Sequence, residues 1–425
     1  MTDKEVGPLK LLCHDVESVG FGDSTTFEGG RLTVSADEAK ACLSSRALAS
    51  TNVSWISPGE SARVIKVLDA VQPRTKGPEG AGIFPGFLGK AMPQGRGETH
   101  VLRGAAVISA GYLPRLQEGL IQMSGPAAEL SPFGSTHNLV VEFEPAEGAA
   151  WEDVDLALRR GILKLAARLA EAALESEPDE EREVAPTTTP APGDRPRIGT
   201  ITNLQTQGTF KDVFVYGRSM SDSLPTLMDP SELEDGAVVS GQYGHPGLKN
   251  NTYLYQNHPV VAALRARDGQ DLDFAGLILS PEPVEQAHKE LISEHAARLC
   301  ASLGLDAVIL TKEGGGNADS DNSLKADACE AMGIKAVSIH GEMAGPDGSG
   351  PPLVSPPTKG SALVSAGNYD EIIKLDAVER ALGGEILDLT DDPSTAELSL
   401  QTAAVYGSLN PLGWGRLTCW EEAAS

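Results

Sequence analysis

The stretch from residue 307 to residue 321, AVILTKEGGGNADSD, constrains the fold more than any other part of the chain. Residues 307–310 carry β-branched side chains and no charge, which is typical of a strand that is buried on both faces. The glycines at 314–316 free the backbone to turn, and Asn317 is a good N-cap for a helix over 324–332. A strand, a turn and a helix N-terminus gather amide N–H groups around one point, which favours an anion such as a carboxylate or phosphate. An ordinary capped loop has the same pattern, so the sequence leaves both interpretations open.

Strand and helix signals alternate after residue 197, including helices near 284–303 and 376–382. This order predicts an α/β fold whose C-terminal part is a doubly wound, largely parallel sheet with helices on both faces. Ligands bind beyond the carboxyl ends of the strands in such sheets. The polar residues expected at those ends form the predicted substrate site, and they are Glu313, Gly314, Gly315, Gly316, Asn317, Asp319, Asp321, His340 and Glu342.

The composition of the chain changes at several points, and these points predict its domains. Residues 1–175 carry short strand signals and one clear helix over 154–174, so they predict a β-rich mixed domain. Residues 176–197 combine an acidic block with prolines and threonines and predict a linker. Residues 198–390 then form the α/β domain, and residues 391–425 form a tail without a clear pattern.

Two glycine-rich segments of the N-terminal part, residues 77–97 and 117–135, are too apolar for free loops. They include aromatic side chains at Phe84, Phe87 and Phe133. We expect these segments to pack against the other domain or a second subunit, in an interface above about 1,000 Å².

The charge of the chain limits its partners. It has 34 basic and 60 acidic residues and a net charge of −26, which argues against binding to nucleic acid or to an anionic membrane. Its five cysteines show no C-x-x-C spacing, the N-terminus lacks a signal-peptide pattern, and no apolar run approaches the ~20 residues of a membrane span. We therefore expect a reduced, cytoplasmic protein.

Several segments resemble one family. They are VGFGDSTTFEGGRLTV (19–34), SPGESARVIKVLDAVQPRTK (57–76), GAGIFPGF (80–87), VLRGAAV (101–107), LQEGLIQMSGPAAELSPF (116–133), PTLMDPSELEDGAVVSG (225–241), KNNTY (249–253) and EGGGNADSD (313–321). This set resembles the α/β-subunit precursor of component B of glycine, sarcosine and betaine reductases. The resemblance implies a complex that cleaves the C–N bond of a small amino-acid-like substrate reductively. It also implies that the precursor cuts itself before a cysteine, which becomes a pyruvoyl group that holds the substrate amine. A cysteine or selenocysteine of a second subunit then takes the carbon.

The chain departs from this family at the cut. The family pattern is Ser-Gly-Asn-Cys, whereas residues 240–253 read SGQYGHPGLKNNTY, which places Tyr243 at the cysteine position and Gly247 at that of a second cysteine. A phenol cannot undergo the elimination that makes a pyruvoyl group from cysteine, and Ser240 is three residues out of register. We therefore expect no pyruvoyl group and no other resident cofactor. Tyr243, His245 and Glu313 become the candidate catalytic residues, with the first two as hydrogen-bond or proton donors.

Three hypotheses follow for the function. The first is a subunit of a reductase-like complex that binds a small amine or carboxylate and works with a subunit carrying cysteine or selenocysteine. The second is a scaffold that has lost the chemistry. The third is a metal-assisted lyase or hydrolase in the same pocket, although no H-E-x-x-H or G-x-S-x-G motif is present. The metal ligands of this third hypothesis would come from His245, His258, His340, Glu313, Asp319 and Glu342.

Overall fold

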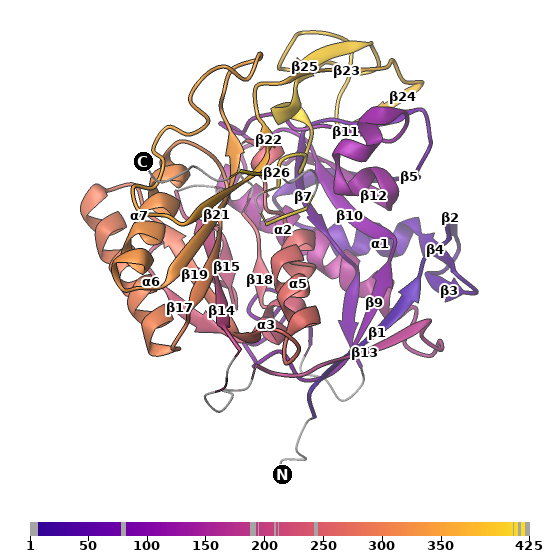
Figure 1. Cartoon of the computed structure of the whole chain (residues 1–425). Coiled ribbons are helices and arrows are strands. Elements are labelled where there is room, and N and C mark those ends of the chain that lie inside the picture. The colour runs from indigo at the N-terminus through magenta and orange to yellow at the C-terminus, as the bar shows by residue number, and fades with distance from the viewer. Residues whose placement is uncertain are drawn as a thin grey trace.

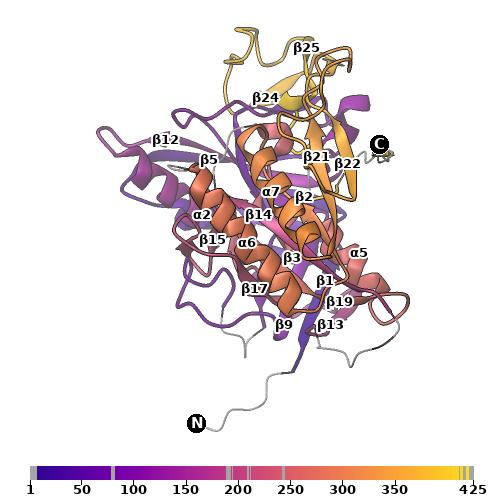
Figure 2. The same cartoon turned by 60° about the vertical axis from the view of Figure 1, so that its left-hand side comes forward.

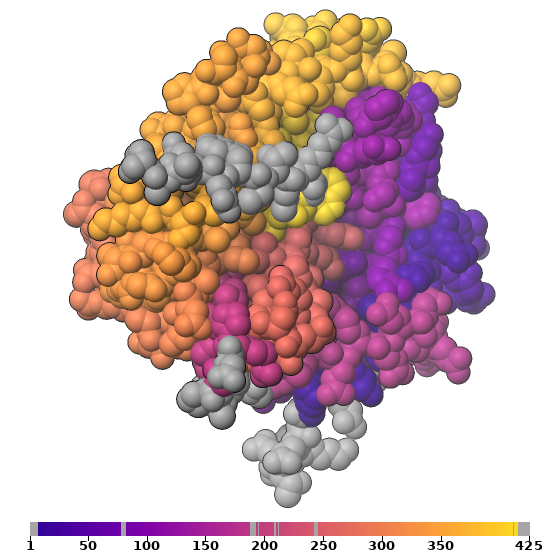
Figure 3. Space-filling view, viewed as in Figure 1, coloured from indigo at the N-terminus to yellow at the C-terminus, as the bar shows by residue number. Residues whose placement is uncertain are grey.

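The computed structural model describes residues 7–77, 82–187, 193, 195–207, 210, 212–241, 245–410 and 412–414, and the backbone of 418–420. Tyr243 lies outside the described residues. The N-terminal and C-terminal halves lie side by side, and the segment that carries β23 (Ile372–Leu375), β24 (Arg380–Leu382) and β25 (Leu398–Gln401) lies across one end of both halves (Figures 1 and 3). Within the described residues, no helix is long and apolar enough to cross a membrane.

Two four-stranded sheets form the N-terminal half. The first has the order β13-β1-β9-β8, with β1 Leu9–Asp15, β8 Arg74–Lys76, β9 Gly97–Arg103 and β13 Glu180–Val184. The second has the order β5-β12-β10-β7, with β5 Leu48–Ile56, β7 Val67–Val71, β10 Ala105–Ala110 and β12 His137–Pro145. Smaller sheets join β2 Ser18–Gly22, β3 Thr26–Glu28 and β4 Arg31–Ser35, and join β6 Ala62–Val64, β11 Ile121–Gln122 and β24 Arg380–Leu382. The segment predicted as a linker thus supplies β13, which pairs antiparallel with β1.

A long helix covers one face of the second sheet. α2 spans Trp151–Glu171, close to the predicted helix, and its apolar stripe is buried, since Leu158 and Ile162 have no exposed surface. The shorter α1, Ala36–Leu43, packs beside it. Successive side chains of β10 point to opposite faces of the sheet. Val107 therefore joins the core under α2, whereas Ile108 joins a separate core on the other face.

The C-terminal half contains a seven-stranded sheet with the order β17-β19-β14-β20-β21-β22-β26. Its strands are β14 Arg197–Gln205, β17 Thr226–Met228, β19 Asp273–Glu282, β20 Ala307–Thr311, β21 Lys335–Glu342, β22 Ala362–Asn368 and β26 Thr418–Trp420. The five strands from β19 to β22 in this order are parallel, and the two edge strands β17 and β26 are antiparallel.

Helices lie on both faces of this sheet. α5, Pro259–Arg267, shares a core with Leu277 and Leu279 of β19. α6, Gln286–Ser302, and α7, Asn317–Ala331, pack together on the other face with Ile278 (Figure 2). The predicted α/β class and largely parallel sheet are confirmed. The regular doubly wound arrangement is not, because the described residues 343–361 between β21 and β22 form no helix.

The predicted helix over 376–382 is wrong. Residues 380–382 form β24, which pairs with β6 of the N-terminal half. The buried Arg63 explains this, because its Nη2 donates to the carbonyl oxygen of Asp376 at 2.8 Å, and Gln122 donates to the same oxygen at 3.1 Å. That carbonyl is therefore held by the N-terminal half and does not accept a helical hydrogen bond. The remaining short elements are α3 Pro230–Glu234, α4 Thr252–Gln256, β15 Phe214–Val215, β16 Arg218–Ser219, β18 Val238–Val239, β23 Ile372–Leu375, β25 Leu398–Gln401, η1 Pro126–Leu130, η2 Pro132–Ser135, η3 Pro246–Leu248 and η4 Thr402–Ala404.

Aromatic side chains of the two glycine-rich segments of the N-terminal half pack inside the chain. Phe84 and Phe133 have no exposed surface. Phe87 contacts Phe214 of the C-terminal half edge-to-face, with ring centroids 5.3 Å apart. These aromatic side chains therefore help to join the two halves, which agrees with the predicted packing against the other domain. The alternative, an interface with a second subunit, stays a prediction.

Candidate active site

Polar side chains meet at the carboxyl edge of the C-terminal sheet. Because β14, β19, β20 and β21 are parallel neighbours, their carboxyl ends lie at the same edge. Gln205 at the end of β14 lies opposite Glu282 at the end of β19. The turn that begins at Lys312 follows β20, and His340 lies near the end of β21.

A buried lysine, Lys249, is the centre of the first group of side chains at this edge. Its Nζ donates to Ser240 Oγ at 2.7 Å, to Glu313 Oε1 at 3.2 Å and to the carbonyl oxygen of Gly241. Tyr255 adds a hydrogen bond from its hydroxyl to Glu313 Oε2 at 3.4 Å. Both Lys249 and Glu313 are fully buried, so each charge depends on the other and on these hydrogen bonds. We call these five residues the Lys249 cluster.

Three distant parts of the chain hold the Lys249 cluster in place. The side-chain amide of Asn250 donates to the carbonyl oxygen of Lys312 at 2.8 Å, which ties the segment to the turn after β20. Asn410 of the tail donates to Asn250 Oδ1 at 2.7 Å. Asp69 of β7 accepts hydrogen bonds from the Thr252 N–H and hydroxyl, at 3.0 and 2.7 Å. The N-terminal half and the tail are thus part of the wall of the site.

Glu313 titrates near neutral pH. Burial raises the pKa of its carboxyl group to about 7, although the Lys249 ammonium acts in the opposite direction. A carboxyl group with a pKa close to the working pH is suited to accept and donate protons. The arrangement is therefore compatible with the predicted catalytic role of Glu313, which stays a prediction.

The glycine turn binds groups of its own chain. Asp319 Oδ2 accepts the Gly316 N–H at 2.9 Å, and the Gly314 N–H lies 3.4 Å from the Leu248 carbonyl oxygen. The other oxygen of Asp319 lies 2.5 Å from Lys312 Nζ and 3.5 Å from His340 Nδ1. Burial alone would raise the pKa of Asp319, but these two partners hold it well below its usual range. The amides of Gly314 and Gly316 therefore have acceptors within the chain, and a ligand anion at this turn stays a prediction.

A second group of buried charges lies between α6, α7 and the strand ends. Lys289 donates to one oxygen of Asp321, and Lys325 Nζ lies 3.6 Å from the other. Glu282 is fully buried nearby, and among the described residues neither its carboxylate oxygens nor the side-chain amide of Gln205 has a hydrogen-bond partner. Burial, and to a smaller extent the charge of Asp321, raises the pKa of Glu282 to about 8. Burial also raises the pKa of Asp321.

The remaining predicted site residues are spread around these two groups. His245 has a left-handed backbone, with φ of 53°, and its Nδ1 lies 2.8 Å from the Tyr369 hydroxyl. Asn317 Nδ2 donates to the Pro283 carbonyl oxygen at 3.4 Å. Glu342 is half-buried at the end of β21. Gly315 lies against the residue that follows β21, since a Cβ atom at Gly315 would be 2.2 Å from Met343 Cε.

Potential metal ligands do not converge in the part of the chain that the structure describes. No three or more histidine, cysteine, aspartate or glutamate side chains there are placed to hold a metal ion together.

Comparison with known proteins decides the family. The family model described as glycine/sarcosine/betaine reductase component B subunits matches residues 8–419. The chain belongs to this family.

The relatives of the chain are components of reductase complexes. The glycine reductase complex component B subunits alpha and beta of Acetoanaerobium sticklandii are 36% identical over 95% of this chain and 97% of the relative. The sarcosine reductase complex component B subunit alpha of Peptoclostridium acidaminophilum is 35% identical over the same shares, and its betaine counterpart is 32% identical over 88% of this chain and 87% of the relative. No solved structure matches the chain.

The structure adds residues to the site that were not predicted from the sequence. Lys249, Tyr255, Asp69 and Glu282 were not among the predicted site residues, although the resembling segment KNNTY begins with Lys249. That segment and the Ser240-Gly241 pair belong to the stretch where the resemblance places the cut of the component B precursor. Within the described residues, Lys249 is the side chain that joins this stretch to Glu313.

Proposed function

We propose that this chain is the substrate-handling subunit of a reductase-like complex that cleaves the C–N bond of a small amino-acid-like substrate without a pyruvoyl group. The observation that carries the proposal is the buried Lys249–Glu313 pair, which adjoins Ser240 and Gly241. A scaffold has no need of a buried carboxyl group that titrates near pH 7. The partner is a second subunit with a cysteine or selenocysteine.

The residues present do not fit a cysteine-derived pyruvoyl group. The resemblance places Tyr243 at the position of the family's cysteine. Of the cysteines in the described part, Cys13 lies in β1 and Cys42 in α1, while Cys300 and Cys329 are buried in the core with α6 and α7. None of these four cysteines lies between Gly241 and Tyr253. We therefore route no step through a pyruvoyl group.

The chain's own residues account for binding and proton transfer in this proposal. Glu313 holds a proton near neutral pH and delivers it to the nitrogen that leaves. Lys249 fixes the Ser240 hydroxyl and the Gly241 carbonyl and also donates to Glu313, so it holds Ser240 and Gly241 beside this carboxyl group. Tyr243 and His245 act as hydrogen-bond or proton donors to the substrate. The polar strand ends at His340 and Glu342 complete the substrate site.

An intact-mass measurement tests the absence of processing. We expect the purified protein to be a single chain of the full sequence mass, 44.5 kDa, without a carbonyl that reacts with hydroxylamine or hydrazine. The physical reason is that the phenol of Tyr243 cannot replace a thiol in the acyl shift and elimination. Two fragments that divide near residue 242 would contradict this part of the proposal.

An activity assay tests the function itself. The chain, combined with the product of an adjacent gene and a thiol reductant, is expected to release ammonia or a methylated amine from glycine, sarcosine or betaine. Glu313→Gln is expected to slow this release about 100-fold or more, because general acid–base catalysis commonly contributes 10²–10⁴-fold. Glu294→Gln on the exposed surface of α6 is the matched control, and it should change the rate less than about twofold. Equal rates for both variants would exclude Glu313 from the chemistry, and an activity that a chelator removes would favour the metal-assisted alternative.

A further inference from the structure

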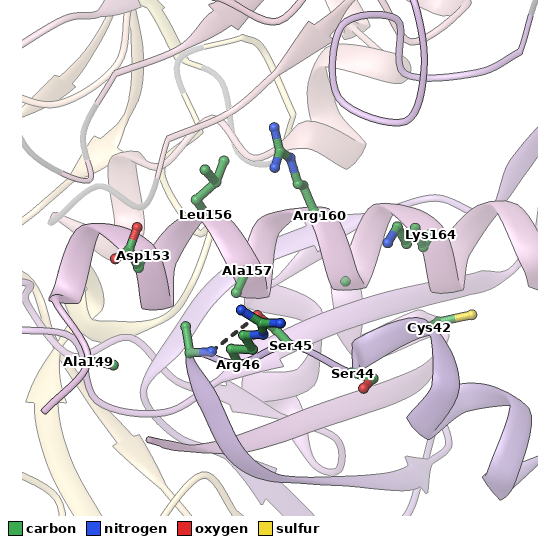
Figure 4. Close-up of a pocket in the computed structure, with 12 residues that line it drawn as sticks. Cys42, Ser44, Ser45, Arg46, Ala149, Asp153, Leu156, Ala157, Arg160 and Lys164 are labelled. Atoms are coloured by element: carbon green, nitrogen blue, oxygen red, sulfur yellow. Dashed lines mark hydrogen bonds between the residues drawn. The ribbon is translucent and has the colours of Figure 1, made fainter. Parts of the chain in front are cut away.

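A groove on the outer face of α2 is separate from the candidate active site. Its cavity volume is about 480 Å³, and it lies between α2 and the segment that joins α1 to β5. Figure 4 shows Arg160 and Lys164 one turn apart on α2, Leu156 on the same helix, and Arg46 on the facing segment. The helix supplies one wall and a surface turn supplies the other.

The charge of the groove is opposite to that of the whole protein. Arg46, Arg160 and Lys164 are exposed, and within the described residues their side chains have no ion pair and no hydrogen bond to another side chain. The neighbouring Arg168 differs, because it pairs with Glu38 at 2.7 Å. Asp153 is the one carboxylate among the residues that line the groove. Three free cations in one hollow on a chain of net charge −26 form a local site for an anion.

An apolar side chain lines the groove beside these cations. Leu156 is among the lining residues and is 38% exposed. Arginine is one of the residue types that are enriched at the centre of protein–protein interfaces. A small anion uses the cations alone, whereas a polypeptide also covers Leu156.

We propose that this groove, formed by Arg46, Arg160 and Lys164 with Leu156 at its margin, docks an acidic segment of the protein that works with this chain. This proposal depends on one part of the proposed function, namely that the chain works in a complex with a second protein. The exposed cations attract the acidic segment and orient it, and the apolar margin contributes contact area once it is docked. The groove lies on a rigid helix, so it needs no rearrangement to receive an extended acidic peptide.

Binding of a fluorescein-labelled oligoglutamate peptide to the full chain tests the groove without any assay of activity. We expect the anisotropy of the labelled peptide to rise with protein at low ionic strength and to fall back at about 1 M salt, where the Debye length is about 3 Å. The double variant Arg160→Glu/Lys164→Glu should weaken binding at least about tenfold.

A matched variant separates the groove from the charge of the whole protein. Arg218→Glu/Lys359→Glu changes the net charge by the same amount on other exposed surfaces, and it should leave peptide binding within about twofold of wild type. Equal loss in both double variants, or no peptide binding to wild type, would overturn the proposal. So would binding of inorganic tripolyphosphate at the groove without binding of the peptide.

A second measurement uses the partner that the activity assay requires. The Arg160→Glu/Lys164→Glu variant should no longer co-elute with the product of the adjacent gene, whereas Glu313→Gln should co-elute like wild type. A groove variant that still assembles would overturn the docking proposal and leave the proposed function intact. Loss of activity in Glu313→Gln with normal assembly bears on the proposed function alone.

Discussion

Replacing Lys249 with methionine is expected to lower the free energy of unfolding by about 3–5 kcal/mol, the usual cost of removing one partner of a buried ion pair. The Lys249 ammonium binds three oxygen atoms in a fully buried place, and methionine leaves all three without this donor. Activity should fall with the stability, because Ser240 and Gly241 lose their connection to Glu313. Denaturant unfolding followed by circular dichroism measures the first effect, and amine release measures the second.

A second lysine offers the control for this experiment. Lys325 is as deeply buried as Lys249, but its Nζ has no hydrogen-bond partner in the described structure, and Asp321 keeps Lys289 when Lys325 is removed. Lys325→Met should therefore cost less than Lys249→Met. The double variant Lys249→Met/Glu313→Gln should recover part of the lost stability, because it leaves no unpaired buried charge. A Lys249→Met protein as stable as wild type would show that the buried pair does not contribute to folding.

The elements that depend on local patterns were predictable from the sequence. The apolar stripe of α2 and the strand–glycine–helix stretch from β20 to α7 both follow from residues that are close in sequence. β24 was not predictable in this way. Its strand form depends on β6, more than 300 residues earlier, and on Arg63, which holds the carbonyl of Asp376. A helical pattern of apolar residues cannot report such a contact.

The candidate site was predictable in outline but not in its centre. The rule that parallel strands end at one edge led to Glu313, Asp319 and His340, which the structure does place at that edge. Lys249 lies 64 residues from Glu313 in sequence, and Asp69 lies 183 residues from Thr252. No short sequence motif can therefore predict these contacts. The sequence predicted an anion site at the glycine turn because glycine residues leave the backbone free to present its amide N–H groups. In the structure, Asp319 Oδ2 accepts the hydrogen bond of the Gly316 N–H, because the two residues are only three positions apart in the same turn.

Replacing Glu282 with glutamine is expected to stabilise the protein by roughly 2–3 kcal/mol at pH 7, an increase that depends on pH. The pKa of Glu282 is about 8 in the folded chain, against an ordinary value of 4.5. Between these values the folded state holds a proton that the unfolded state has released, so the wild-type protein loses stability as the pH rises from about 4.5 to about 8. Glutamine has the shape of the protonated carboxyl group and does not ionise in the unfolded chain, so it removes this loss.

Urea unfolding of wild type and Glu282→Gln at several pH values measures the difference. The two proteins should be almost equally stable near pH 4.5, and the variant should gain steadily up to about pH 8 and remain constant above it. The control is Glu285→Gln, whose side chain is 76% exposed at the start of α6 and should show no such trend. A constant difference at all pH values would mean that Glu282 ionises normally in the folded chain. Its carboxylate oxygens would then need partners beyond the described residues, because a buried charge without a hydrogen bond is not stable.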